Sequence, residues 1–318
     1  MAQDGKDIAE HAAAGPHRRR RIGPPCPAAG PRAMTNPEGT HMRDDPQPAA
    51  HPGPASGQGT GLRRVPVLNA HVHDIAMDEL LDRLDAGMLL TLHTDMLVKL
   101  QTDRDFYEAL DAFDIITCDS QILYFALRLM GTPVRERVSG SDFFPRFCAR
   151  HRDDPEVTVF LCGGQPGVAE RAAEKVNART GRRIVVGTHA PPFDFDTDPA
   201  ALEAMIDAIN ASRATVLVVG LGGGRQEKFL VANRHRFTHA RLFLPLGGTI
   251  DYEAGTIRRP PPWVTDWGLE WLSRVIQEPR ARWHRYFVQQ PPALWLLLAQ
   301  RLGRYRNPFA PPADDNGG

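Results

Sequence analysis

The feature that most constrains the fold is an alternation, from residue 65 onward, between short apolar runs and longer amphipathic segments. The apolar runs predict buried strands at 88–92, 114–118, 157–164, 182–188, 214–220 and 240–248. Helical patterns occur at 104–113, 120–131, 141–151, 166–180, 198–212 and 225–237, the third with Ser141 or Asp142 as its expected cap. Strands joined by single helices predict an α/β fold, with a Rossmann-like, largely parallel sheet flanked by helices.

Composition divides the chain into four parts. Residues 1–61 hold ten Pro and nine Gly together with the arginine run 18–21. Such a segment cannot bury enough apolar surface to offset its ordering entropy. We therefore predict a disordered tail at 1–61, an α/β domain at 62–255, a helical C-terminal appendage at 256–306 and a second disordered tail at 307–318.

The charge balance and the cysteines narrow the function classes. The 38 basic residues equal the 38 acidic residues in number, so no overall field favours a nucleic-acid partner. Cys26, Cys118, Cys148 and Cys162 lie far apart, which argues against a zinc or disulfide framework and suits a reducing compartment. No apolar run reaches the roughly 18 residues that a membrane-spanning helix needs.

The segment 256–306 differs from the rest of the chain in composition. It contains nine Arg against three acidic residues, and all five Trp of the chain. Arginine mixed with tryptophan and leucine is typical of a helix at a membrane interface, where indole rings lie at headgroup depth and arginine meets phosphate. A helical subdomain that packs its tryptophans inward would have the same composition, so both interpretations stay open.

Five features that could bind a ligand lie at the ends of short, strand-like runs, which is where ligands bind in open parallel sheets. They are His71 and His73, residues 91–95, Asp119, Gly163 and Gly164, and the loop 220–224. Asp119 could accept a proton from a hydroxyl group, or it could only cap the following helix. His71 and His73 form a His-x-His pattern that suits a metal-dependent amidohydrolase, although that class needs a barrel and further ligands.

The glycine-rich sequence GLGGGRQEKF, residues 220–229, joins a predicted strand to a helix. Such a turn often holds a phosphate, because N–H groups and the helix dipole point toward the anion. The sequence lacks both the GxGxxG pattern of dinucleotide-binding proteins and the GK[ST] ending of a P-loop. Arg225 and Lys228 are unfavourable at a helix N-terminus unless they face an anion; the alternative is a tight turn with a solvated helix start.

Seven motifs occur in order along the chain. They are TLHTDML (91–97), FDIITCDS (113–120), GTPVRERVSGSD (131–142), GGQPGVA (163–169), VGLGGGRQE (219–227), LGGTIDYEAG (246–255) and RRPPPWVTDWGLEWLSRVIQEPRARWHRY (258–286). Together they resemble the WecG/TagA/CpsF glycosyltransferase family, glycosyltransferase family 26, from about residue 65 to 292. Their shared order and spacing make this resemblance more specific than any single glycine loop.

The resemblance implies an inverting enzyme without metal or cofactor that moves a sugar from a nucleotide-sugar, usually UDP-linked, to a polyprenyl-diphosphate-linked glycan. Such steps build exopolysaccharide, capsule and other cell-surface polysaccharides, which implies a cytoplasmic protein peripheral to the inner face of the cell membrane. The enzyme that the resemblance implies could also form a homo-oligomer. Asp119 matches the general base; Thr91, His93, Arg137, Gln226 and Asp251 match substrate-binding positions; Arg259, Arg274, Arg282 and Arg285 match the appendage. Arg137 and the appendage arginines are the candidates for stabilising the departing diphosphate.

Three positions depart from the family pattern. His93 stands in place of Asn, Ser120 in place of Gly, and Gly224 in place of Pro. Because His can carry a charge near neutral pH and Asn cannot, we expect a hexose or uronic-acid donor rather than an N-acetylated one. Ser120, beside the catalytic position, could instead signal weakened catalysis. A non-catalytic nucleotide-sugar-binding protein is the alternative function.

Overall fold

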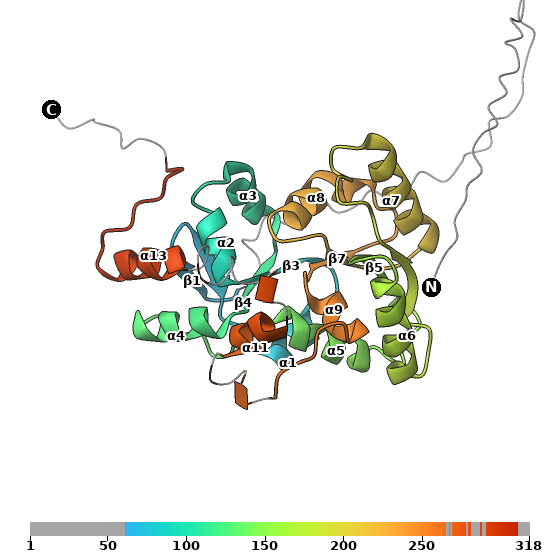
Figure 1. Cartoon of the computed structure of the whole chain (residues 1–318), viewed down its shortest axis with the longest axis horizontal. Helices are drawn as coiled ribbons and strands as arrows, with labels where there is room; N and C mark the ends of the chain where they lie inside the picture. The colour runs from blue at the N-terminus through green and yellow to red at the C-terminus, as the bar shows by residue number, and fades with distance from the viewer. Residues whose placement is uncertain are drawn as a thin grey trace, which may run out of the picture. The chain divides into compact units, whose positions relative to one another are not determined.

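The fold is that of a computed structural model of the chain (Figure 1). The structure describes residues 61–261, 263–264, 267, 269–277, 279–280, 287 and 291–310. All of these residues belong to one compact unit, Pro52–Gly318. The predicted tails therefore lie outside the described residues, apart from residue 61 and residues 307–310.

A six-stranded parallel sheet forms the centre of this unit. Its strands in chain order are β3 Gly87–Leu92, β4 Ile115–Cys118, β5 Val159–Gly163, β6 Val185–His189, β7 Val216–Gly220 and β8 Leu242–Pro245. Their order across the sheet is β4-β3-β8-β7-β5-β6, and each neighbouring pair is parallel. The predicted Rossmann-like sheet is confirmed, and each of its strands lies where an apolar run predicted one.

Helices cover both faces of the sheet (Figure 1). One face carries α2 Thr94–Lys99, α3 Arg104–Ala109, η1 Leu110–Ala112, α7 Pro199–Ser212, α8 Arg225–Asn233 and η2 Arg234–Arg236. The other carries α1 Met77–Arg83, α5 Gly140–Arg150, α6 Val168–Thr180 and α9 Thr249–Ala254. The helix α4 Gln121–Leu129 follows the edge strand β4. This arrangement places every loop that leaves the carboxyl end of a strand at one edge of the sheet.

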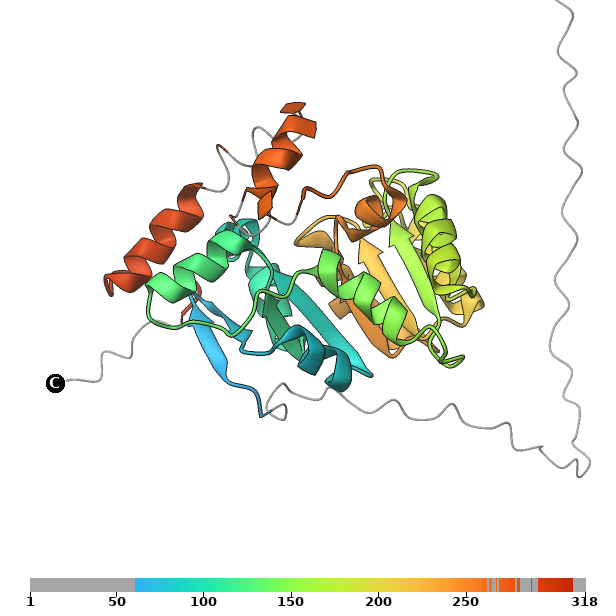
Figure 2. The same ribbon diagram turned by 90° about the horizontal axis from the view of Figure 1, so that it is seen from below.

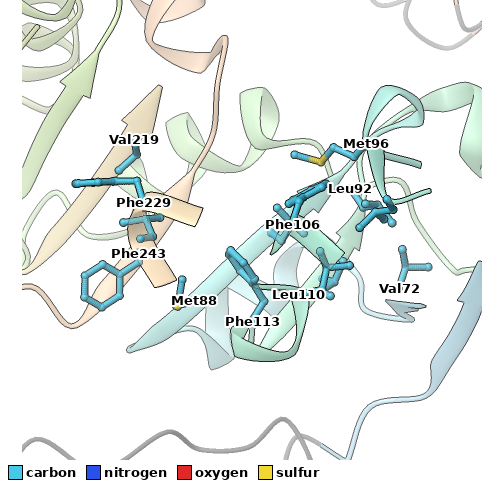
Figure 3. Close-up of a cluster of buried hydrophobic side chains, with 14 of the residues drawn as sticks. Val72, Met88, Leu92, Met96, Phe106, Leu110, Phe113, Val219, Phe229 and Phe243 are labelled. Atoms are coloured by element: carbon cyan, nitrogen blue, oxygen red, sulfur yellow. The ribbon is translucent and has the colours of Figure 1, made fainter. Parts of the chain in front are cut away.

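The strands divide their side chains between two buried clusters. In β3, Met88, Leu90 and Leu92 belong to the first cluster, while Leu89 belongs to the second. Figure 3 shows part of the first cluster, where Phe106 of α3 lies near Leu92 of β3. This alternation follows from the pleat of a strand, which directs successive side chains to opposite faces. Burial on both faces explains why the strands have continuous apolar sequences.

The start of α5 differs from the expected one. Its N-cap is Ser139, whose Oγ accepts a hydrogen bond from the Asp142 N–H at 3.2 Å. The expectation that Ser141 or Asp142 caps this helix is therefore wrong. Both of those residues lie in the first turn, where Asp142 is available for ion pairs with arginine.

Two segments that are distant in the sequence meet beside β4. The strands β1 Arg64–Val67 and β2 Ala70–His73 form an antiparallel hairpin. The helix α13 Pro291–Arg301 lies beside β1 and α4 in both views (Figures 1 and 2). It buries Ala293 and Leu297 in the first cluster, and its Gln300 Oε1 accepts a hydrogen bond from the Leu68 N–H at 2.8 Å. The C-terminal part of the chain therefore completes the core of the α/β unit.

The packed structure also continues beyond α13. Asn307 Nδ2 donates to Tyr107 Oη at 3.2 Å, and the Phe309 ring lies 5.3 Å from the ring of Tyr107. The predicted boundary at residue 306 therefore does not coincide with the end of the packed chain.

Candidate active site

A cavity of about 550 Å³ lies at the carboxyl ends of β3, β4, β7 and β8. The strands β3 and β8 are neighbours in the sheet. From β3 the chain goes to β4, at the near edge of the sheet, whereas β8 is preceded in the chain by β7, its neighbour on the side away from β3. The strand order thus reverses between β3 and β8, which is where open α/β sheets bind their ligands. Five predicted substrate or catalytic residues line the cavity: Thr91, His93, Asp119, Gln226 and Asp251.

Asp119 lies directly after β4 and lines the cavity. The N-cap of the following helix is its neighbour Ser120, whose Oγ accepts a hydrogen bond from the Leu123 N–H at 3.1 Å. Thr94 Oγ1 donates to the same Ser120 oxygen at 3.2 Å. Of the two roles open to Asp119, capping α4 is therefore taken by Ser120, and the departure from Gly at position 120 has a structural role.

A chain of polar contacts connects Asp119 to the start of the appendage. Arg137 Nη1 donates to the Asp119 backbone carbonyl at 3.0 Å, and its Nη2 donates to Asp142 Oδ2 at 2.9 Å. The other Asp142 oxygen accepts from Arg259 Nη1 at 3.1 Å. Arg259 also donates to the backbone carbonyl of Ser141, which lines the cavity. Arg137 thus lies behind Asp119 rather than among the cavity-lining residues.

The Asp142 carboxylate holds this chain together as an anion. Burial alone would raise its pKa, but the hydrogen bond from Ser139 and the charges of Arg137 and Arg259 outweigh burial and lower the pKa. Two guanidinium groups therefore share one carboxylate. The arrangement orients the backbone at Asp119 and fastens residue 259 close to the cavity.

The glycine loop is held from behind by Gln226 and Glu227. Gln226 Nε2 donates to the Pro245 carbonyl at 3.1 Å and to Glu227 Oε1 at 2.8 Å. The second Glu227 oxygen accepts from the Gly224 N–H at 2.5 Å. These contacts tie the loop after β7 to the end of β8. The buried amide of Gln226 therefore shapes the cavity wall in addition to lining it.

Glu227 is completely buried beneath this loop. Burial raises the pKa of its carboxyl to about 7, against the hydrogen bonds from Gln226 and Gly224 and the charge of Lys99. The protonation state of Glu227 therefore changes close to neutral pH. Sequence analysis did not single out Glu227, because its role depends on folding the loop back over it.

Arg225 and Lys228 do face anions, but the anions are carboxylates of the protein itself. Arg225 forms two hydrogen bonds to Asp196, at 3.0 and 2.7 Å, and its guanidinium lies over the rings of Phe193 and Phe195. Lys228 Nζ donates to Asp103 at 2.8 Å. Neither residue lines the cavity. Of the two interpretations left open for this helix start, the one in which Arg225 and Lys228 face an anion is correct, and the anions are Asp196 and Asp103.

The helix α2 presents a row of polar side chains to the cavity. His93, Asp95 and Lys99 all line it, and Asp95 and Lys99 lie four residues apart on one helix face. His93 Nδ1 lies 3.8 Å from Asp95 Oδ1. Lys99 Nζ donates to the Gly223 carbonyl at 2.5 Å, across the cavity wall in the glycine loop. Asp95 belongs to the polar stretch 91–95 that sequence analysis singled out. Lys99 was missed, although its spacing of four residues from Asp95 on a helix was a usable signal.

The N-termini of two helices, α5 and α8, lie at the cavity. Gly140 and Ser141 open α5, and Gly222 and Gly223 precede α8. A helix N-terminus carries a partial positive charge and N–H groups that lack partners within the helix. These helix starts favour a ligand that carries negative charge at this end of the sheet.

Gly163 ends β5 and Gly164 follows it, at the predicted end of the strand, but neither residue lines the cavity. Gly163 has a φ of 126°, and a Cβ atom there would overlap the Gly220 carbonyl oxygen. A residue with a side chain would push β5 and β7 apart at their carboxyl ends. This pair therefore serves the close approach of two strands next to the site.

The appendage is described in part. Arg259 is placed by the contacts above and by its guanidinium, 5.5 Å from the ring centre of Tyr252, which lines the cavity. The side chain of Arg274, in α11 Glu270–Gln277, and the residues Arg282 and Arg285 lie outside the described parts. The described indole side chains, Trp263, Trp267 and Trp295, are 62, 76 and 71 % exposed. Inward packing is therefore wrong for these three tryptophans.

None of the helices within the described ranges has the length and apolar character to cross a lipid bilayer. The exposed apolar side chains are instead spread over short amphipathic segments. Leu294, Trp295, Leu298 and Leu302 lie on or directly after α13, and Phe125 and Leu129 lie on α4 beside it.

His71 and His73 lie in the β1–β2 hairpin, outside the parallel sheet, and neither of them lines the cavity. His73 Nδ1 accepts a hydrogen bond from the Ile116 N–H at 2.9 Å. Burial, the neighbouring His71 and Arg64 lower the pKa of His73 to about 4. Among the described residues, no group of three or more His, Cys, Asp and Glu side chains could hold a metal ion. The sheet is also open, so the barrel that an amidohydrolase needs is not the fold of this unit.

Comparison with known proteins agrees with this geometry. A curated relative from Bacillus subtilis (strain 168), N-acetylglucosaminyldiphosphoundecaprenol N-acetyl-beta-D-mannosaminyltransferase, is 24% identical over 243 residues, covering 76% of this chain and 91% of the relative. Residues 65–307 match the glycosyl transferase WecG/TagA/CpsF family. The match spans the whole sheet, the cavity and the described part of the appendage. The chain therefore belongs to the WecG/TagA/CpsF family of glycosyltransferases.

Proposed function

We propose that this glycosyltransferase moves a sugar from a nucleotide-sugar, a UDP-linked one, to a glycan on polyprenyl diphosphate during synthesis of exopolysaccharide or another cell-surface polysaccharide. The observation that carries the proposal is the cavity at the strand-order reversal, with Asp119 on its wall and the starts of α5 and α8 beside it. The Bacillus relative is named for an acceptor sugar on diphosphoundecaprenol, which supports the class of acceptor.

The residues around the cavity suit an inverting displacement. In the proposed reaction, the Asp119 carboxylate takes the proton of an acceptor hydroxyl as its oxygen attacks the anomeric carbon of the donor sugar. The bond from that carbon to the diphosphate oxygen breaks, and the nucleoside diphosphate leaves with its electron pair. Arg137 holds the Asp119 backbone through its carbonyl, while Thr91, Gln226 and Asp251 are the proposed substrate contacts.

His93 is the proposed determinant of the donor sugar. Its imidazole lines the cavity, next to Asp95 and opposite Gly223. An imidazole that gains a proton would favour a donor with a carboxylate, so the proposed donor is a uronic acid or a plain hexose. His93→Asn should then shift the preference toward N-acetylated donors.

The proposed location is the inner surface of the cell membrane. The exposed indole rings of Trp263, Trp267 and Trp295 are of the kind that lie at headgroup depth, and arginines are frequent in the same segment. Co-sedimentation with anionic phospholipid vesicles tests this proposal. Trp295→Ala should weaken the association, and equal sedimentation with and without vesicles would contradict a membrane location.

A donor panel tests the function itself. The purified protein is incubated with membrane lipid extracts and one nucleotide-sugar at a time, and the lipid products are identified by mass. We expect a mass increase of one hexose or one uronic acid. Exclusive use of an N-acetylmannosamine donor would contradict the proposed donor class, and no transfer from any donor would contradict the proposed reaction.

A further inference from the structure

The cavity has an unusual charge balance for a site that binds a diphosphate. Asp95, Asp119 and Asp251 line it with three carboxylates. Lys99 is the one Lys or Arg among the described cavity-lining residues, and His93 is the one histidine. A nucleoside diphosphate adds further negative charge, so it needs positive groups at close range to be bound.

The arginines and the second lysine near the cavity are engaged elsewhere. Arg137 and Arg259 share Asp142, Arg225 is paired with Asp196, and Lys228 is paired with Asp103. None of these four cations is among the cavity-lining residues. Each of them has a carboxylate partner in the protein before any ligand arrives.

Lys99 differs from them in its partner. Its Nζ donates to the backbone carbonyl of Gly223, and it forms no ion pair with any carboxylate in the described part of the chain. This contact places the ammonium beside the loop Gly222–Gly224, which runs into the start of α8. A lysine ammonium has three N–H donors, so two are left for a ligand once Gly223 has accepted one.

We infer that Lys99 binds the diphosphate of the nucleotide-sugar, together with the N–H groups of the glycine loop at the start of α8. This inference rests on the proposed nucleotide-sugar donor and names the residue that meets its phosphates. Lys99 then neutralises the charge that builds up on the leaving diphosphate when the glycosidic bond breaks. It takes the role for which sequence analysis named Arg137 and the appendage arginines.

Lys228 provides a matched control for Lys99. Both lysines lie on helices next to the glycine loop, and both are ordered by one polar contact. They differ in that Lys99 lines the cavity, whereas Lys228 is paired with Asp103 outside it. Removing the charge of Lys228 should therefore leave nucleotide binding unchanged, although it takes one positive charge from the surroundings of the glycine loop, as removal of the Lys99 charge does.

The experiment measures binding of UDP, UMP and uridine to the full chain by calorimetry. Wild type, Lys99→Met, Lys99→Gln, Lys99→Arg and Lys228→Met are compared. Gln can still donate a hydrogen bond toward the Gly223 carbonyl but carries no charge, so it separates loop anchoring from phosphate binding. We expect Lys99→Met and Lys99→Gln to weaken UDP binding about ten- to a hundredfold. Uridine binding should change little, and Lys99→Arg should retain most of the UDP affinity.

Three results would overturn the inference, and they are distinguishable. UDP binding that is unchanged in both neutral variants would show that Lys99 does not contact the phosphates. Equal losses for UDP and uridine would assign Lys99 to shaping the loop only. If wild type binds none of the three ligands, nor ADP, GDP or dTDP, the nucleotide donor itself is wrong and the proposed function falls with it.

Discussion

The histidine hairpin, β1–β2 with His71 and His73, and the cavity wall around Asp119 both carry titratable side chains that the sequence marked for chemistry. In the hairpin, His73 is buried, and its Nδ1 is occupied by the Ile116 N–H. In the wall, Asp119 follows a parallel strand and borders a space of about 550 Å³. The two regions differ in what surrounds the side chain, not in the reactivity of the residue types.

The difference teaches where a polar residue can act in this fold. A side chain after a parallel strand lies at the sheet edge, where loops leave room for a ligand. A side chain in a hairpin that packs against the flank of an edge strand satisfies backbone groups instead. Four measurements test this comparison, beginning with the one that should show the largest effect.

Replacement of the proposed base should have the largest effect. Asp119→Asn keeps the size of the side chain but removes the proton acceptor, so we expect the transfer rate to fall at least about a hundredfold. The matched variant His71→Gln in the hairpin should change the rate less than about threefold, as expected for a residue outside the chemistry. Product formation is followed by mass spectrometry under identical donor and acceptor concentrations.

Two results of that measurement would change the comparison. An Asp119→Asn variant with the wild-type rate would point to a binding protein or to a different base. A large loss of rate in the His71 variant, with the stability of wild type, would place the hairpin within the chemistry.

The next largest effect concerns His73 and acid stability. Its pKa is about 4 in the folded protein and ordinarily 6.5, so the unfolded chain binds the proton more tightly. The contribution of His73 to the free energy of unfolding is therefore complete above pH 6.5. About 3 kcal/mol of that free energy is lost as the pH falls from 6.5 through 4. His73→Asn, which can still accept the Ile116 N–H, should remove this part of the pH dependence in urea denaturation. An unchanged pH slope would show that His73 does not titrate between the two states.

Glu227 beneath the glycine loop should show an effect of similar size and opposite sign. Its pKa is about 7 when folded against an ordinary 4.5, so the folded protein holds the proton more tightly. The contribution of Glu227 to the free energy of unfolding is complete below pH 4.5. About 3 kcal/mol of that free energy is lost as the pH rises from 4.5 through 7. Glu227→Gln should therefore flatten the decline of stability between pH 4.5 and 7. The His73 variant is the control, because it should alter the slope in the other direction.

The smallest effect should come from the outer side of the glycine loop. Arg225→Lys loses the paired hydrogen bonds to Asp196, which is 46% exposed. Exposed ion pairs contribute little, so we expect less than about 1 kcal/mol in the free energy of unfolding. Nucleotide affinity should not change, and a clear fall in affinity would return Arg225 to the binding site.

Sequence analysis predicted the elements of the sheet well because their signal is local. The strands β3 and β7 are buried on both faces, so their sequences are continuous apolar runs, which are typical of the central strands of a parallel sheet. The order of the strands was not predicted, since β5 lies beside β7 rather than next to β4, and no local pattern specifies a neighbour. The hairpin was missed because its strands are only four residues long and one contains Pro66.

The candidate site was predicted where a residue's role depends on its place at a strand end. Asp119 and Thr91 are of this kind, and both line the cavity. It was not predicted where the role depends on a partner far along the chain. Lys228 pairs with Asp103, which is 125 residues away in sequence, so its charge could not be assigned to an internal ion pair beforehand.

The packing of α13 has a consequence for how the molecule is made. The Leu68 N–H is satisfied by Gln300, which is synthesised 232 residues later. At typical elongation rates, the hairpin therefore waits roughly 10 to 50 s on the ribosome before its partner exists. The wall of the cavity also depends on this late helix, since α13 contacts α2, which begins directly after His93 and ends at Lys99. This wall of the cavity therefore cannot be completed in the nascent chain until α13 has been synthesised.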